Sequence, residues 1–159
     1  MSAEQLAGAE AALVAAARGA HALGLRRAGR EALQAVKDGE EAKRKSYAAL
    51  CWLSRPLAPA DFEALSSAAP LTVAQDTPVR VLHRRAARVR DKTIYQLSGA
   101  PVPGRPQYLT LTMTTQAGTY IKEFVHGDFG RTRPSLGDLL GGCRAEILQL
   151  DVTDVHMEV

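Results

Sequence analysis

A strict alternation of apolar and hydroxyl side chains runs through QYLTLTMTTQAG, residues 107–118, and leaves the chain few ways to fold. Leu109, Leu111 and Met113 alternate with threonines, so the apolar side chains of an extended segment all point to one face. A period of two is typical of a half-buried antiparallel strand, which has one face on a core and the other in solvent. The sequence therefore predicts a sheet that is covered on one face.

Further strands are predicted on both sides of this segment. The short apolar run SYAALCWLS (46–54) is bounded by charged residues and by Arg-Pro, which favours a buried strand. Residues 77–99 show a strand period near each end and predict one long or two successive extended segments, followed by a Gly- and Pro-rich loop at 99–106. Alternation over residues 145–159 predicts a closing strand.

Helices are predicted at the N-terminus and between the strands. Residues 3–23 are dense in Ala and Leu, which are strong helix formers, and residues 30–37 predict a second helix. A short helix is expected from Pro59 to near Pro70, with Asp61 as the N-cap candidate. A chain of 159 residues with these elements fits one domain with a real core.

Composition restricts the class of protein. Cys51 and Cys143 lack the paired spacing of a zinc site and are too few for a disulfide framework, so we expect two free thiols in a reducing compartment. No stretch approaches the roughly 18 apolar residues of a membrane span, and Glu4 and Glu10 stand where a secretory signal is basic. The sequence predicts a soluble intracellular protein without a membrane partner, and it does not distinguish nucleus from cytoplasm.

The arginines are clustered, although the chain as a whole is only mildly basic. Its 20 Lys and Arg residues face 17 Asp and Glu residues, a formal net charge of +3. Between residues 80 and 92, Asp91 is the single acidic residue among Arg80, Arg84, Arg85, Arg88, Arg90 and Lys92. Such a local field predicts a segment that follows an RNA phosphate backbone. A charge-protected edge strand explains the same residues, and the pattern leaves both interpretations open.

Two further residues have both a functional and a structural interpretation. Tyr47 stands where a charged stretch gives way to an apolar strand, so its ring either stacks on an unpaired base or is a half-buried strand residue. Lys122 falls in the first turn of a helix expected from its cap, Thr119, to His126. The helix dipole opposes a cation at that place, so Lys122 either faces an anionic group or is simply exposed. His126 and Asp128 have no third ligand nearby, so no metal site is expected.

Four segments resemble one enzyme family. These segments are similar to the archaeal and eukaryotic tRNA pseudouridine synthases that act at uridines 54 and 55: GEEAKRKSYAAL (39–50), TPVRVLHRR (77–85), TQAGTYIKEFVHGDFGRT (115–132) and ILQLDVTDV (147–155). The resemblance covers about residues 23–159, which implies an Ala-rich helical extension at 1–22 followed by the C-terminal part of the catalytic domain. It implies an α+β fold, half of the pseudouridine synthase fold, in which a mixed, mainly antiparallel sheet is flanked by helices and crossed by an RNA cleft.

The same resemblance implies a chemistry without cofactor or metal. A uridine of tRNA is flipped into the pocket, an aspartate attacks, the glycosidic bond breaks, and the base rejoins the sugar through carbon. Tyr47 would stack on the target base, and Lys122 would pair with the catalytic aspartate and keep it ionised. Leu139 or Leu140 would lie against the base. The residues expected to hold the tRNA backbone are Arg80, His83, Arg84, Arg85, Arg88 and Arg90.

The catalytic aspartate itself is missing from the resemblance. In the family it belongs to an R-E-D-x-D type motif upstream of the region that resembles residues 23–46, and no such motif occurs in this sequence. Asp38, Asp128 and Asp138 are not expected to replace it, because the placement of a nucleophile is geometrically exacting. We therefore expect a C-terminal catalytic half that is inactive alone and depends on a separate or upstream segment for the aspartate. The alternative is a non-catalytic tRNA-binding module.

Overall fold

The computed structural model of the chain consists of two compact units, Met1–Asp38 and Gly39–Val159. The residues that the structure describes are 2–16, 25, 27–34 and 43–156. No helix within those ranges is long and apolar enough to cross a membrane.

The first unit contains the helices predicted near the N-terminus. α1 spans Ala3–Ala16, and a second helical segment begins at Arg30 and is described as far as Gln34. The other residues of these two predicted helices, 17–23 and 35–37, lie outside the described ranges. No residue of α1 is buried, and the described hydrophobic core belongs to the second unit.

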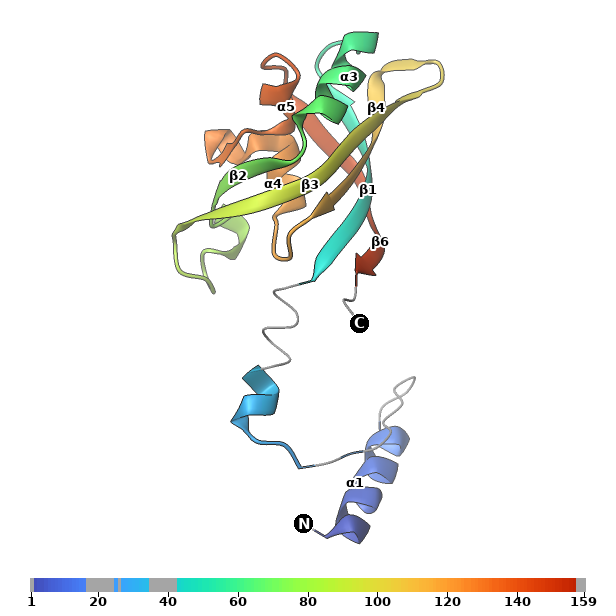
Figure 1. The fold of residues 1–159 in the computed structure, drawn as a ribbon, viewed down its shortest axis with the longest axis vertical. Coiled ribbons are helices and arrows are strands. Elements are labelled where there is room, and N and C mark those ends of the chain that lie inside the picture. The colour runs from blue at the N-terminus through green and yellow to red at the C-terminus, as the bar shows by residue number, and fades with distance from the viewer. Residues whose placement is uncertain (1, 17–24, 26, 35–42, 157–159) are drawn as a thin grey trace. The chain divides into compact units, whose positions relative to one another are not determined.

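The second unit is built on a six-stranded sheet of order β5-β2-β3-β4-β1-β6, in which neighbouring strands pair antiparallel (Figure 1). Helices pack on this sheet, so the predicted α+β fold is confirmed. The elements in chain order are β1 (Arg44–Leu53), α3 (Pro59–Ala68), β2 (Leu71–Asp76), the 3₁₀ helix η1 (Val79–Val81), β3 (Val89–Val102), β4 (Arg105–Thr115), α4 (Ile121–His126), the 3₁₀ helix η2 (Gly127–Gly130), β5 (Thr132–Arg133), α5 (Leu136–Leu139) and β6 (Ala145–His156).

The core lies on one face of the sheet. Leu109, Leu111 and Met113 of β4 are fully buried, whereas the threonines that separate them are exposed. The predicted half-buried strand is therefore confirmed. Leu65 of α3 and Phe124 of α4 join the same hydrophobic cluster as the β4 residues, so the helices cover the apolar face.

β1 confirms the predicted strand at 46–54, and β6 confirms the one at 145–159 as far as His156, since 157–159 lie outside the described residues. β1 is a central strand, because it pairs with β4 on one side and with β6 on the other. Within the described part of the chain, no strand pairs with the outer edge of β6. That strand exposes Leu148, Val152 and Val155, so the open edge of the sheet is also apolar.

Residues 77–88 form a loop, which contradicts the prediction that an extended segment begins there. Val79–Val81 is a turn of 3₁₀ helix, and the long strand β3 starts only afterwards. The hydroxyl of Thr77 donates to the carbonyls of Ala86, at 2.8 Å, and Arg88, at 3.2 Å. These side-chain hydrogen bonds close the loop and compete with strand pairing, so the local alternation is misleading. We call residues 77–88 the basic loop.

The sequence predictions are also wrong about two strand regions. Residues 99–106 are not a loop, because β3 and β4 continue to a tight turn at Pro103 and Gly104, where Gly104 has a φ of 70°. β2 is not predicted, because the buried Gln75 interrupts its apolar pattern. The Gln75 amide is nevertheless satisfied: it donates to the carbonyl of Tyr120 and accepts from the Tyr120 N–H, both at 2.9 Å.

Neither predicted helix cap acts as one. The N-cap of α3 is Ala58, and Asp61 lies three residues further on, where its carboxylate accepts from the Ala58 N–H at 2.7 Å. α4 begins after Tyr120, while the Thr119 hydroxyl donates to the carbonyl of Gln116 at 2.7 Å. Thr119 therefore stabilises the turn before the helix.

Candidate functional site

Lys122 and His126 are the two exposed residues of α4, whose other four residues are buried. The buried residues fix α4 against the sheet, while the side chain of Lys122 stays accessible. Together with residues 147–150 of β6, Lys122 lines a cavity of about 210 Å³. The position in the first helical turn agrees with the prediction.

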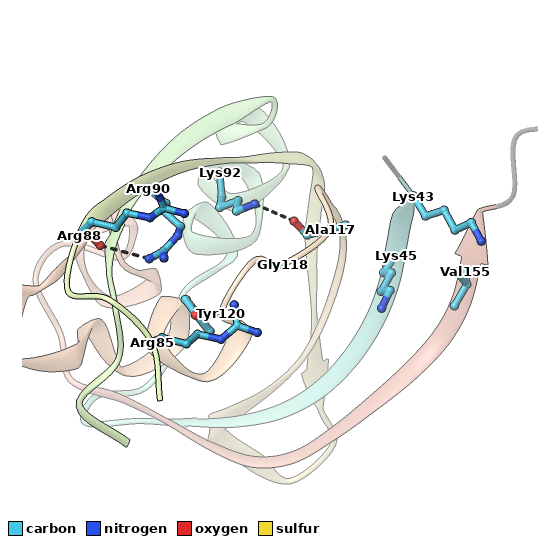
Figure 2. A pocket seen from close by; sticks show the side chains of 10 residues that line it. All are labelled: Lys43, Lys45, Arg85, Arg88, Arg90, Lys92, Ala117, Gly118, Tyr120 and Val155. Carbon is cyan, nitrogen blue, oxygen red and sulfur yellow. Dashed lines mark hydrogen bonds between the residues drawn. The ribbon is translucent and has the colours of Figure 1, made fainter. Parts of the chain in front are cut away.

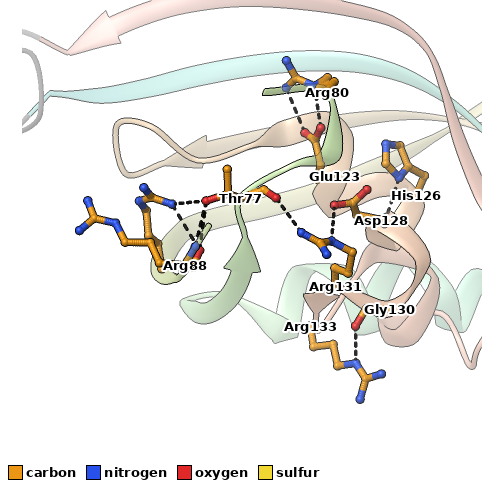
Figure 3. Close-up of polar contacts among 10 residues, drawn as sticks. Thr77, Arg80, Arg88, Glu123, His126, Asp128, Gly130, Arg131 and Arg133 are labelled. Carbon is orange, nitrogen blue, oxygen red and sulfur yellow. Dashed lines mark hydrogen bonds and ion pairs between the residues drawn. The ribbon is translucent and has the colours of Figure 1, made fainter. Parts of the chain in front are cut away.

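Glu123 is 2% exposed and is paired with Arg80. Sequence reasoning predicted neither its burial nor its partner. The Arg80 guanidinium donates to both carboxylate oxygens, from Nε at 2.7 Å and from a terminal nitrogen at 3.2 Å (Figure 3). Those hydrogen bonds, with the attraction of the carboxylate, raise the pKa of Arg80. The guanidinium also lies 5.9 Å from the ring centroid of Tyr120. Arg80 thus joins the basic loop to α4, and its charge is balanced by Glu123.

Tyr47 lies on the core face of β1, beside β6. It packs against the hydrophobic cluster and is half-buried, and burial raises the pKa of its phenol, which therefore stays neutral near pH 7. Its partner on β6 is Val152, and the next β1 residue on that face, Ala49, pairs with Leu150. Because Leu150 also lines the cavity at Lys122, β6 connects the surroundings of the two predicted catalytic residues.

The two leucines expected near the base differ in exposure. Leu140 is 2% exposed and belongs to the hydrophobic core. Leu139 is only partly buried at the end of α5. Only Leu139 of this pair has side-chain surface that a ligand can contact.

A pocket of about 710 Å³ lies between the start of β1 and the basic loop. Figure 2 shows Lys43 and Lys45 on one side of it and Arg85 on the other, near Tyr120. Six of the ten described lining residues are Lys or Arg, and none of the ten is acidic. We call this the basic pocket, and its lining residues are Lys43, Lys45, Arg85, Arg88, Arg90, Lys92, Ala117, Gly118, Tyr120 and Val155.

Hydrogen bonds hold part of the cationic lining in place. Arg90 donates to the hydroxyl of Thr77 at 2.7 Å, and Lys92 Nζ donates to the carbonyl of Ala117 at 2.8 Å. Gly118 has a φ of 74°, and a Cβ atom there would lie 3.3 Å from Lys92 Nζ. The turn before α4 therefore approaches Lys92 closely because residue 118 is a glycine.

The structure separates the predicted RNA contacts into three groups. Arg85, Arg88 and Arg90 line the basic pocket, whereas Arg80 is paired with Glu123. The exposed His83 and Arg84 lie on the basic loop outside the described lining of the pocket. Sequence reasoning missed the lysines at 43 and 45, although the KRK run beside Tyr47 was a visible signal, whereas Lys92 belongs to the basic segment that was predicted to follow RNA.

Asp128 and Asp138, two of the three aspartates considered as replacements for the missing catalytic aspartate, have other partners. Asp128 is 6% exposed and accepts from Arg131 Nε at 3.4 Å (Figure 3). Asp138 accepts from the hydroxyl and the N–H of Ser135 in a capping box. Asp38 lies outside the described residues. The geometry thus commits Asp128 and Asp138 to structural contacts.

Metal-binding side chains do not gather at any one place in the described ranges. Among those residues there is no group of three or more His, Cys, Asp or Glu side chains that could hold a metal ion. Both cysteines are free thiols, as predicted, and burial raises the pKa of Cys51 to about 12.

A one-sided antiparallel sheet with a cationic pocket defines a domain suited to a phosphate-rich ligand such as RNA.

Comparison with known proteins identifies the family. The family model described as "Pus10, C-terminal" matches residues 1–156. A tRNA pseudouridine synthase Pus10 from Homo sapiens is 46% identical over 129 residues, which cover 81% of this chain and 24% of that protein. A putative tRNA pseudouridine synthase Pus10 from Drosophila melanogaster is 45% identical over 129 residues, which cover 81% of this chain and 26% of that protein. The chain belongs to the Pus10 C-terminal family, so the predicted family is confirmed.

The fold has a counterpart among solved structures. A chain in the crystal structure of a Cbf5-Nop10-Gar1 complex matches with a TM-score of 0.57 at 21% identity, over 79% of this chain and 34% of that chain. This likeness concerns the fold alone. The chain spans about a quarter of the length of the curated relatives it matches.

Proposed function

We propose that the chain is the C-terminal part of the catalytic domain of a tRNA pseudouridine synthase that isomerises uridine 54, uridine 55 or both. The basic pocket carries the proposal. Its six cationic residues come from the start of β1 and from the segment between Arg85 and Lys92, and they suit the closely spaced phosphates of a folded RNA. The names of the relatives supply the substrate class, tRNA.

The backbone contacts are proposed to be distributed over the pocket and the loop beside it. Arg85, Arg88 and Arg90 hold phosphates together with the lysines at 43, 45 and 92. His83 and Arg84 extend the contact along the exposed side of the basic loop. Arg80 contributes indirectly, because it fixes the loop to α4 through Glu123.

The reacting uridine is proposed to lie between Tyr47 and Lys122, along β6. A neutral, half-buried phenol offers a ring face on which a flipped base can stack. The Lys122 ammonium stabilises the ionised form of an attacking carboxylate, so the nucleophile is charged at neutral pH. Leu139 has accessible apolar surface to support the base, which Leu140 lacks.

The nucleophilic aspartate is proposed to come from outside these 159 residues, in a separate or upstream segment. Asp128 and Asp138 are already engaged by Arg131 and Ser135, which supports this assignment. Neither carboxylate is among the described residues that line the cavity at Lys122, so neither stands where the attacking aspartate is expected. The chain by itself is therefore expected to bind tRNA and to release no product.

Mapping pseudouridine in the organism of origin tests the proposed function. Disruption of the gene should remove pseudouridine from position 54, 55 or both of tRNA, and the intact gene should restore it. The purified 159-residue chain should release no tritium from tRNA that carries 5-tritiated uridine. Unchanged pseudouridine after disruption would contradict the enzyme assignment, and rapid tritium release would contradict the external aspartate.

A non-catalytic tRNA-binding module is the second candidate, favoured by the engaged state of Asp128 and Asp138. It predicts the same salt-dependent tRNA binding. It differs in the disruption experiment, where all tRNA pseudouridines would persist while the purified chain still binds tRNA.

A further inference from the structure

Phe129 is 98% exposed, on the segment that links α4 to β5. It stands in a run of four residues with positive φ: Gly127 at 77°, Asp128 at 44°, Phe129 at 57° and Gly130 at 82°. A bulky residue in the left-handed region is uncommon, because its Cβ crowds the backbone. An aromatic ring that is both fully exposed and held in such a conformation has no role in the core of this unit.

The strained conformation is fixed from both sides. The Asp128 N–H donates to Nδ1 of His126 at 3.0 Å, and the Asp128 carboxylate accepts from Arg131 (Figure 3). On the other side of Phe129, Arg133 Nε donates to the carbonyl of Gly130 at 2.7 Å. The backbone therefore cannot relax into a common conformation without losing these contacts, and it projects Phe129 into solvent.

Two arginines follow Phe129 within the same segment, at 131 and 133. Arg131 donates to the carbonyl of Thr77 at 2.8 Å, which joins the segment directly to the start of the basic loop. Arg133 is exposed and lies four residues after Phe129. An exposed aromatic ring in the same segment as arginines is a combination that binds unstacked bases of RNA, because the ring stacks on the base while the cations hold nearby phosphates.

We propose that Phe129 is a base-stacking residue: it receives an unpaired nucleobase of the bound RNA, distinct from the uridine that reacts beside Tyr47. The contacts that fix Asp128 and Gly130 hold the backbone of Phe129 in place before RNA arrives, so little backbone ordering is needed on binding. This inference rests on the proposed function, since it assumes that the basic loop holds RNA.

Measuring tRNA binding by the full 159-residue chain tests the proposal. Phe129→Leu retains apolar bulk but removes the π face, and it should weaken tRNA affinity about tenfold. The slope of log affinity against log salt should stay the same, because no phosphate contact is lost. Phe129→Trp should bind like the unchanged protein, and its indole fluorescence should be quenched by tRNA that contains an unpaired loop.

Leu33→Ala is the matched control, because Leu33 is an apolar side chain, 58% exposed, on the other compact unit. It should leave tRNA affinity unchanged. If Phe129→Leu also leaves affinity unchanged, the stacking role is wrong. If the unchanged protein itself does not bind tRNA, the proposed function is wrong, so the two failures are distinguishable.

A second variant separates function from folding. Phe129→Gly relieves the left-handed strain, so it should raise the thermal midpoint of unfolding by about 2 to 4 °C while tRNA binding weakens. Opposite changes in stability and binding support a strained residue maintained for RNA contact. Higher stability with undiminished binding would overturn the proposal.

Discussion

The basic pocket and the cavity at Lys122 differ in how much of each site this chain supplies. The basic pocket is lined by cations from separate segments: the start of β1, the basic loop and the first residues of β3. The cavity at Lys122 combines one cation with residues 147–150 of β6, and none of these described lining residues is acidic. The basic pocket offers several cations to several phosphates. The cavity at Lys122 contains the cation of an expected ion pair without its carboxylate partner.

This difference follows from what each task requires. Phosphate binding sums many weak interactions, so it tolerates variation in the position of any single cation. Attack on a sugar requires one carboxylate at one place, held within a fraction of an ångström. The chain is therefore expected to retain RNA affinity when chemistry is lost, and single substitutions should separate the two properties.

The largest effect is expected at Lys122. In the intact enzyme, Lys122→Ala should lower the rate of pseudouridine formation about a hundredfold or more, since the attacking carboxylate loses its counter-charge. Tritium release from tRNA with 5-tritiated uridine measures the rate. Lys122→Arg keeps a cation and should retain part of the activity. A large loss of tRNA affinity in Lys122→Ala would place Lys122 among the phosphate contacts instead.

Charge reversal on the two sides of the basic pocket should have the largest effect on tRNA binding. Lys45→Glu and Arg85→Glu should each weaken tRNA binding about tenfold, and each should make the salt dependence less steep. Fluorescence anisotropy with labelled tRNA over a series of salt concentrations measures both. Arg105→Glu reverses an exposed arginine at the far hairpin and should change little. If all three variants behave alike, binding is diffuse and the pocket has no special role.

Removing the partner of Glu123 should affect folding more than binding. Arg80→Ala leaves a buried carboxylate unpaired and should lower the free energy of unfolding by about 2 kcal/mol, less than for a fully buried pair because Arg80 is half exposed. Urea unfolding measures this change. Arg84→Ala, on the same loop, should leave stability nearly unchanged. An Arg80→Ala variant of full stability but reduced salt dependence of tRNA binding would make Arg80 a phosphate contact.

The smallest effect is expected at Gly118. Gly118→Ala combines a positive φ with crowding at Lys92, so it should cost about 1 kcal/mol of stability and weaken tRNA binding less than threefold, on the order of 0.5 kcal/mol. Gly104→Ala is the matched control, because Gly104 has a φ of 70° and a Cβ atom there would meet nothing within 4 Å. It should lose similar stability and keep full tRNA affinity. Equal binding by both variants would remove Lys92 from the RNA contacts.

Much of the fold follows from local patterns, and the failures have local causes. The alternation at Leu109, Leu111 and Met113 correctly predicts a half-buried strand, since a strand's faces are set by neighbouring residues. The same reasoning fails at residues 77–88, where the Thr77 hydroxyl closes a loop. It also misses β2, because Gln75 is buried only by virtue of its bonds to Tyr120, 45 residues away.

The sequence predicted which residue types form the candidate site, but it did not predict which side chains pair with one another. The density of arginines between residues 80 and 92 correctly marks a cationic region. Density alone does not reveal that Arg80 is balanced by Glu123, because the two lie 43 residues apart in the chain. The roles of Tyr47 and Lys122 come from family resemblance and remain predictions for the experiments above.

The sequence by itself determined the one-sided strand, the cationic region and the family, because each depends on the order and type of nearby residues. Only the tertiary structure decided which cations share a pocket, which carboxylates are engaged and that Phe129 stands in solvent. Those properties depend on distances between segments far apart in the chain. Burial and pairing set the charge that a ligand meets, and both exist only once the sheet has brought β1, the basic loop and α4 together.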